Sequence, residues 1–314
     1  MNSAPDREQW SAIPSPPTDR VVAVTEFLAS RPGEPATVAE LVRRLGLNRA
    51  TCHAVLASLV RAGWVVRDPV EKTFTPGPAL IALGRAAETG VPVARAAEGE
   101  LAALVRELGM AVTAGYPSGE HIVVGSHLAV DGDDADADVV RVGQRIPFAP
   151  PFGPGLVAWE GEPEIARWLA RAPHADPART RRFRAVLATV RRRGYTVESD
   201  TPASRRLRAL LVELDSLSPR GRPAVTELLH EIGTIDYLDD DLQEARTYPV
   251  GVMSAPAFTG AGVTALNISV YVWADLDPAG IRAVGDRLLA ASRTITHNLR
   301  GTPPRDFPRG TVDS

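Results

Sequence analysis

The chain has 314 residues, of which 44% are hydrophobic and 23% charged, and a formal net charge of −3 at pH 7. This length predicts two cores, a small domain and one of roughly 150 to 200 residues. The lack of an uncharged apolar run of about 18 residues excludes a membrane-spanning protein. The slight negative charge argues against a non-specific polyanion binder, so any DNA binding must be local.

The N-terminal segment and the single cysteine bear on the compartment. Residues 1–18 contain four prolines but no basic cluster followed by an apolar core, so we expect a disordered leader rather than a secretory signal. Cys52 is the only cysteine, which excludes an intramolecular disulfide and favours the cytoplasm. It can be a small buried hydrophobe or a redox-sensitive thiol, and burial is favoured because few positive charges surround it.

Residues 19–76 have the pattern of a winged helix-turn-helix domain. Glu40 stands three residues after Thr37, which is the spacing of a capping box at a helix start. Two helices joined by a short glycine-containing turn are typical of a helix-turn-helix motif. The expected elements are a first helix at 19–30, a second from the cap Thr37 to Gly46, a third from the cap Asn48 to Gly63, and wing strands at 64–67 and 73–75.

The remainder of the chain predicts an α+β fold with a second, larger domain. Its expected helices are 93–108, 163–171, 177–193 and 277–299, and its expected strands are 111–116, 121–127, 195–198, 248–258 and 263–272. The predicted divisions of the chain are a leader at 1–18, the winged helix-turn-helix at 19–76, a linker helix at 77–91, the second domain at 92–300 with an insertion at 200–247, and a disordered tail at 301–314.

Two acidic regions are candidates for metal binding, and neither has suitable spacing. The stretch 131–138 lacks the ligand order of a calcium loop and is predicted to be a solvated loop. His230-Glu231, followed by the acidic run 236–241, lacks the His-Glu-x-x-His spacing of a catalytic zinc site. No nucleophile elbow or phosphate-binding glycine loop is present either, so no metal, cofactor or catalytic residue is predicted.

Specific residues resemble the isocitrate lyase regulator (IclR) family of bacterial transcription factors over nearly the whole chain. They include Leu45-Gly46-Leu47-Asn48-Arg49-Ala50-Thr51, Phe74-Thr75-Pro76-Gly77-Pro78, Gly143-Gln144-Arg145-Ile146-Pro147 and Ala255-Pro256-Ala257-Phe258. The resemblance implies a GAF-like α/β effector-binding domain after the linker helix. The chain departs from the family at Ala54, where arginine is usual, at Pro154-Gly155, which replaces Gly-Lys, and in the insertion at 200–247.

DNA recognition requires side chains that reach base edges from the first turns of a helix and cations beside the phosphates. In this chain the candidates lie on the third helix and around it. They are Asn48, Arg49, Ala50, Thr51 and His53 for the bases, and Arg43, Arg44, Arg67 and Lys72 for the phosphates.

The resemblance also implies an effector site against the late strands, closed by the loop 143–155. In the family, small acids meet an acidic residue, a cysteine and two serines there. The corresponding residues are Asp240 as one of Asp239–Asp241, Val252 at the cysteine, and Ser269 and Tyr271 at the serines, with Phe148 and Phe152 in the loop. This apolar and aromatic set predicts a larger, partly apolar or aromatic ligand instead of a small carboxylate.

We therefore predict a cytoplasmic transcriptional regulator, repressor or activator, that binds double-stranded operator DNA under the control of a small-molecule effector. The apolar stripes of 77–88 and 93–108 predict a homodimer or a dimer of dimers, since one short helix reads too few base pairs to select a site. The alternative is an enzyme or a protein-interaction module on the effector-domain fold with a vestigial DNA reader.

Overall fold

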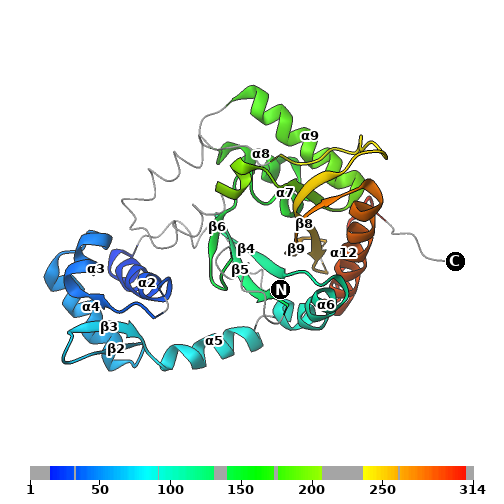
Figure 1. Cartoon of the computed structure of the whole chain (residues 1–314). Coiled ribbons are helices and arrows are strands. Elements are labelled where there is room, and N and C mark those ends of the chain that lie inside the picture. Colours follow the sequence, from blue (N-terminus) through cyan, green and yellow to red (C-terminus); the bar gives the residue numbers. More distant parts are fainter. Residues whose placement is uncertain are drawn as a thin grey trace, which may run out of the picture. The chain divides into compact units, whose positions relative to one another are not determined.

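The computed structural model describes residues 15–31, 33–90, 92–130, 140–172, 176–206, 236–260 and 262–308. They fall into two compact units that divide between Ala87 and Glu88, and each is described by itself (Figure 1). Several predicted features lie outside the described residues: the leader before residue 15, the acidic loop 131–138, the pair His230-Glu231 and most of the insertion 200–247.

The first unit contains three helices and a small antiparallel sheet. The helices are α2 (Pro16–Ala29), α3 (Val38–Leu45) and α4 (Arg49–Arg61), and the strands are β1 (Ala36–Thr37), β2 (Val65–Arg67) and β3 (Thr73–Pro76) in the order β1-β3-β2. The predicted leader was too long at its end, because α2 starts at Pro16 and not at Asp19. Two prolines fit the first turn, where no backbone N–H is needed for the helix.

Side-chain caps set the start of both helices of the helix-turn-helix. Thr37 Oγ1 accepts a hydrogen bond from the backbone N–H of Glu40 at 3.2 Å, and Asn48 Oδ1 accepts one from Thr51 at 2.8 Å. Gly46 closes α3 with a φ of 66°, a left-handed conformation that favours glycine. Local chemistry thus fixes where α3 ends and α4 begins.

A close backbone approach joins the wing to the next helix, α5 (Ala79–Gly90). The backbone N–H of Gly77 donates to the Trp64 carbonyl at 2.6 Å. A Cβ at position 77 would lie 2.3 Å from the carbonyl oxygen of Gly63, so no other residue fits without a shift of the backbone. The glycine in the run Phe74–Pro78 therefore has a steric cause.

The core of the first unit contains the single cysteine. Cys52 is fully buried, and burial raises the pKa of its thiol above the ordinary value. The residue is thus a small core hydrophobe and not an accessible thiol. The buried residues of this core are Val24, Phe27, Leu28, Ala36, Leu41, Cys52, Val55, Leu56, Leu59, Val65 and Phe74.

The second unit is a six-stranded antiparallel sheet with helices on both faces (Figure 1). Its strands are β4 (Val112–Ser118), β5 (His121–Leu128), β6 (Arg145–Pro147), β7 (Thr196–Ser199), β8 (Tyr248–Phe258) and β9 (Thr264–Leu276), in the order β6-β5-β4-β9-β8-β7. The helices are α6 (Pro92–Leu108), α7 (Pro154–Val157), α8 (Glu162–Ala170), α9 (Pro177–Arg193) and α12 (Pro278–Asn298).

Helices α6 and α12 pack side by side, and their apolar residues share one core with a face of the sheet (Figure 1). Leu101 and Leu104 of α6 are buried there with Ile268 and Val270 of β9. The α6 stripe that was expected to hold a dimer together is thus occupied within its own unit. The other face of the sheet carries α7, which contacts β8 and β9.

The C-terminal segment 301–308 is ordered, which corrects the prediction of a disordered tail from residue 301. Phe307 is buried, and its ring centroid lies 5.0 Å from that of Trp159 and 5.1 Å from that of Phe258. Both contacts are edge-on, which is a favourable geometry for aromatic rings. This packing and the backbone hydrogen bonds from Gly301 to Thr296 and from Thr302 to Thr259 hold a segment whose proline content suggested disorder.

Candidate DNA-binding and effector sites

Helix α4 presents its N-terminal half to solvent. Arg49, Ala50 and His53 are exposed and Thr51 is half-buried, while the apolar residues of the helix face the core. Asn48 is also exposed, and its side-chain oxygen is bound to the N–H of Thr51. Asn48 is therefore first a helix cap, and its side-chain N–H₂ group remains as a donor.

The predicted phosphate-binding cations flank this half of α4 in the chain. Arg43 and Arg44 are in the last turn of α3, Arg67 ends β2, and Lys72 precedes β3. All four are exposed. Within the described part of the chain neither they nor Arg49 takes part in an ion pair, so their charge is not neutralised by a neighbouring carboxylate.

The turn of the wing is built to hold Lys72 at its end. Asp68 Oδ1 accepts hydrogen bonds from the backbone N–H groups of Val70 at 2.8 Å and Glu71 at 2.9 Å. Lys72 follows with a φ of 56°, in the left-handed region. Val70 at the tip is 79% exposed.

On the second unit, a row of polar side chains crosses one face of the sheet. Register places His127 of β5 opposite Thr113 of β4, Thr113 opposite Ser269 of β9, Ser269 opposite Ser254 of β8, and Ser254 opposite Thr196 of β7. Residues directly opposite share a face of a sheet. This polar row lies on the face away from α6 and α12, since the alternate positions Val270 and Met253 are in the core with those helices.

Hydrogen bonds connect several members of the row to each other and to Asn267. Ser254 Oγ donates to Ser269 Oγ at 2.9 Å, and Asn267 Nδ2 donates to the same oxygen at 3.3 Å. Thr113 Oγ1 lies 3.3 Å from the hydroxyl of Tyr271. Thr113, Ser254 and Thr196 are each only 4% exposed, whereas Ser269 and Asn267 in the middle of the sheet are half-buried.

Three of the predicted effector residues come together on this face. Val252 is directly opposite Tyr271, and both belong to a small apolar cluster with Ala111 and Val124. Ser269 lies two residues before Tyr271 on the same strand and therefore on the same face. Hydroxyl groups and apolar groups thus lie side by side on this face of the sheet.

Two bonds to α8 and the residue after it hold the loop that carries Phe148 and Phe152. The guanidinium of Arg171 lies over the ring of Phe148 at 5.8 Å and donates to its carbonyl at 3.1 Å. The carbonyl of Phe152 accepts a hydrogen bond from Trp168 Nε1 at 2.9 Å. Both residues fasten the loop 143–155 to α8 and the residue after it.

Asp240, the aspartate predicted for the effector site, is held by α9. Its carboxylate is bound to Arg192 at 2.7 Å and to Arg193 at 3.0 Å on the C-terminal turn of α9. Asp239, its neighbour, instead lines a pocket of about 150 Å³. The two neighbouring carboxylates thus have different surroundings.

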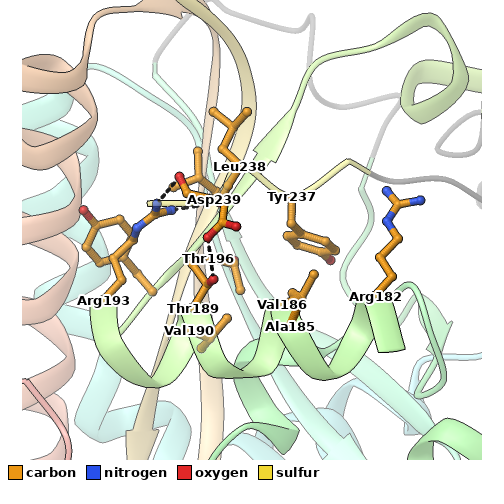
Figure 2. A pocket seen from close by; sticks show the side chains of 12 residues that line it. Arg182, Ala185, Val186, Thr189, Val190, Arg193, Thr196, Tyr237, Leu238 and Asp239 are labelled. Atoms are coloured by element: carbon orange, nitrogen blue, oxygen red, sulfur yellow. Dashed lines mark hydrogen bonds between the residues drawn. The ribbon is translucent and has the colours of Figure 1, made fainter. Parts of the chain in front are cut away.

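This pocket lies between α9 and the segment 237–239, and Figure 2 shows Tyr237 and Asp239 directed toward α9, whereas Leu238 points away from it. Thr189 Oγ1 donates to Asp239 Oδ1 at 2.9 Å, and Arg193 donates to the carbonyls of Leu238 and Asp239. Hydrogen bonds from the backbone N–H of Asp240 and from Thr189 lower the pKa of Asp239. Thr196 belongs both to this pocket and to the polar row.

Tyr237 lies at the other end of the pocket (Figure 2). Its hydroxyl donates to the Pro151 carbonyl at 2.9 Å and lies 3.3 Å from Glu198 Oε1. Burial and the charge of Glu198 raise the pKa of Tyr237 well above its ordinary value, so the phenol stays neutral. The pocket thus has an apolar wall and polar ends whose groups already have partners.

Sequence reasoning missed most of the polar row and its neighbour Asn267. The signal was present as isolated small polar residues in otherwise apolar strands, Ser254 in β8 and the pair Asn267 and Ser269 at a spacing of two in β9. A polar group in a buried strand requires a partner. Only the register between five strands shows that these polar residues form a continuous row, and no single strand encodes that register.

Comparisons with known proteins bear on both units. The family model "IclR helix-turn-helix domain" matches residues 17–69, which span α2 to the wing. The HTH-type transcriptional regulator XynR of Escherichia coli (strain K12) is 25% identical over 170 residues. That match covers 52% of this chain and 66% of XynR, which is slightly less than two thirds of the relative.

Solved structures match the fold over nearly its whole length. An IclR transcriptional regulator from Alicyclobacillus acidocaldarius has a TM-score of 0.64 at 20% identity and covers 91% of this chain and all of its own. An IclR homologue from Microbacterium hydrocarbonoxydans, complexed with 4-hydroxybenzoate, has a TM-score of 0.58 at 18% identity, with coverage of 90% and 99%. The predicted α+β architecture, a helix-turn-helix domain followed by a sheet domain with helices, is confirmed.

Proposed function

Because the chain belongs to the IclR family of transcriptional regulators, we propose that it binds double-stranded DNA through α4 and the wing. A small molecule bound by the second unit alters that affinity. The observation that carries the DNA-binding proposal is the exposed N-terminal half of α4, with Arg49 and the flanking cations outside any ion pair of the described residues.

The chemistry of DNA supports this assignment of α4. A helix fits the major groove, and residues of its first turns reach the base edges. Arg49 can make two hydrogen bonds to guanine, while Ala50 offers a methyl group to thymine. Arg43, Arg44, Arg67 and Lys72 supply cations for the phosphates that fix the register of the protein on the duplex.

A gel-shift titration tests the proposal. The DNA upstream of the gene for this chain is the probe, and a scrambled duplex of equal length is the competitor. Specific retardation that survives excess competitor is expected. Retardation that the competitor abolishes, or none at all, favours the alternative of an enzyme or interaction module with a vestigial DNA reader.

We further propose that the protein works as a homodimer or a dimer of dimers in the cytoplasm, where bacterial DNA is. Ile81 is 60% and Leu83 46% exposed on α5, which gives that helix apolar surface suited to a second copy. With the α6 stripe buried in its own unit, α5 carries the dimer proposal. Light scattering at micromolar concentration should give at least twice the monomer mass, and a monomeric mass contradicts it.

The proposed effector site is the sheet face that carries Val252, Ser269 and Tyr271. Apolar surface from Val252 and Tyr271 would supply most of the affinity, and the polar row would orient the ligand. An aromatic or partly apolar molecule fits this composition. The fold neighbour that holds 4-hydroxybenzoate adds support, since a ring compound occupies a related fold. No enzymatic activity is proposed.

A further inference from the structure

One corner of the polar row has an acceptor without a partner. Asn267 is on β9, two residues before Ser269 and on the same face of the sheet. Its Nδ2 group donates to Ser269 Oγ, which leaves Oδ1 as the free end of the amide. Among the described residues Oδ1 is buried and has no hydrogen-bond partner. A buried carbonyl oxygen that lacks a partner costs about 1 to 3 kcal/mol, so a donor brought by a ligand is favoured there.

The neighbouring hydroxyl has the opposite character. Ser269 Oγ accepts hydrogen bonds from both Ser254 Oγ and Asn267 Nδ2. A hydroxyl oxygen that accepts two bonds has its own hydrogen left to donate. Within the described part of the chain that hydrogen has no acceptor. Ser269 and Asn267 therefore present one donor and one acceptor side by side.

The charges around this corner do not suit an anion. None of the strands β4, β5, β7, β8 and β9 contains an arginine or a lysine, and the turn of helix α7 above them has none either. The acidic Glu198 on β7 is opposite Val252 on the same sheet. A carboxylate ligand would bring a negative oxygen next to Asn267 Oδ1 with no cation to compensate the loss of its hydration.

The backbone of α7 comes very close to this corner. A Cβ at position 155 would lie 2.9 Å from Asn267 Oδ1, so a larger residue there would press on this acceptor. Gly155 is fully covered, while Asn267 and Ser269 retain partial exposure in the middle of the sheet. A ligand that reaches them must therefore approach along the sheet face and present a small polar group.

We propose that Asn267 and Ser269 together bind an uncharged hydroxyl or amide group of the effector, and that a carboxylate is discriminated against at this position. A hydroxyl donates its hydrogen to Asn267 Oδ1 and accepts from Ser269, and an amide does the same with its N–H and carbonyl. The apolar body of the ligand then lies against Val252 and Tyr271. The inference rests on the proposed effector function of this sheet face and names its ligand class.

Three probes that share one ring test the proposal in the full-length protein. They are 4-methylphenol, which donates and accepts, 4-methylanisole, which has no donor, and 4-methylbenzoate, which is anionic. Calorimetric titration should show 4-methylphenol binding about tenfold more tightly than either of the others, because one buried hydrogen bond corresponds to about that ratio. Tighter binding of 4-methylbenzoate, equal binding of phenol and anisole, or no binding of any probe at millimolar concentration overturns it.

Matched variants test whether Asn267 causes the preference for 4-methylphenol. Asn267→Leu removes the acceptor at similar size and should reduce 4-methylphenol to the affinity of 4-methylanisole. Asn298→Leu, an exposed position at the end of α12, is the control and should leave the preference intact. Asn267→Ala serves as the second variant should the leucine disturb folding, which a thermal melt reports. An unchanged phenol preference in a folded Asn267 variant contradicts the role of this residue.

The same protein preparation is used for the gel shift, so that a failure of the DNA-binding proposal can be distinguished from a failure of the ligand-class proposal. If specific DNA retardation is lost while 4-methylphenol is still preferred, the proposed regulatory function is contradicted and the proposed ligand class is retained. If DNA retardation is normal but 4-methylbenzoate is preferred, the proposed ligand class is contradicted and the proposed regulatory function is retained.

Discussion

Helix α9 is far richer in arginine than the helix-turn-helix, yet its charges are used differently. It has seven arginines, and most of them are bound to other parts of the second unit. Arg184 pairs with Glu162, Arg192 with Asp240, and Arg191 donates to the Ala158 carbonyl. By contrast, Arg49 and its neighbouring cations in the first unit take part in no ion pair of the described residues.

The difference teaches that the number of cations does not identify a DNA-binding surface. A guanidinium bound to a carboxylate must give up that partner before it can meet a phosphate, and the exchange cancels much of the gain. An exposed cation with no partner has no such cost. In this chain most arginines of α9 hold segments together. In the first unit Arg31 is paired with Glu34 and Glu40, whereas Arg43, Arg44, Arg49 and Arg67 are available to a polyanion.

The largest expected effect is a loss of stability on removal of a bound arginine of α9. The side chain of Arg193 is 9% exposed, and it binds the Leu238 and Asp239 carbonyls and the carboxylate of Asp240. Arg193→Ala should lower the free energy of unfolding of the second unit by about 3 kcal/mol, because three acceptors lose a charged donor whose own side chain is largely buried. Urea unfolding measures the change, and Arg181→Ala on the exposed side of α9 is the control. An equal, small loss in both variants would show that α9 does not act as a structural clamp.

The next effect concerns the other half of the comparison, the free cation on α4. Arg49→Ala should weaken binding to the upstream duplex by about 1 to 3 kcal/mol if Arg49 makes a bidentate base contact. Arg184→Ala on α9 removes the same charge from a paired position and should leave the affinity unchanged. Fluorescence anisotropy on both variants decides between them. Equal losses would mean that net charge, and not position, governs DNA binding.

A smaller effect separates the two roles of Asn48. Asn48→Ala removes the cap of α4 and should reduce stability by about 1 kcal/mol. Asn48→Asp keeps the capping oxygen and should keep the stability, yet it should weaken DNA binding because it adds a negative charge beside the phosphates. Thermal unfolding measures the stability, and fluorescence anisotropy measures the DNA affinity. A normal DNA affinity in Asn48→Asp would place this residue away from the duplex.

The smallest effect is expected in the wing. Lys72→Gly removes one cation and keeps the left-handed backbone that the φ of 56° requires. In this variant the slope of the logarithm of the DNA-binding constant against the logarithm of the salt concentration should become shallower by about one. That is the value for one lost phosphate contact. Asp68 and its turn remain in place, so the wing itself should be retained. An unchanged slope indicates that the wing tip does not touch the backbone of the DNA.

Local signals made the first unit predictable from its sequence. The caps Thr37 and Asn48 and the left-handed Gly46 each act within three residues, so the bounds of α3 and α4 follow from the sequence to within about one residue. Strand β1 was missed because its two residues have no pattern of their own. Its only cause is pairing with β3, in which Ala36 stands opposite Phe74.

The second unit depends on contacts between distant residues, which no local sequence pattern reveals. Asp239 is bound by Thr189, which is 50 residues away in the chain. Phe307 orders the C-terminal segment by packing on Trp159, which local composition cannot show. The polar row requires the register of five strands at once, so its single members look like ordinary polar residues in buried strands.

The central claim is that the free cations of the first unit read a specific DNA site, and a footprint of the wild-type protein on its upstream DNA tests it most directly. A dimer of this domain predicts two protected half-sites about one helical turn apart, centred on the major groove. Protection in that pattern, persisting with excess scrambled duplex, is the predicted result. A uniform footprint or none, with a folded and dimeric protein, would contradict the account.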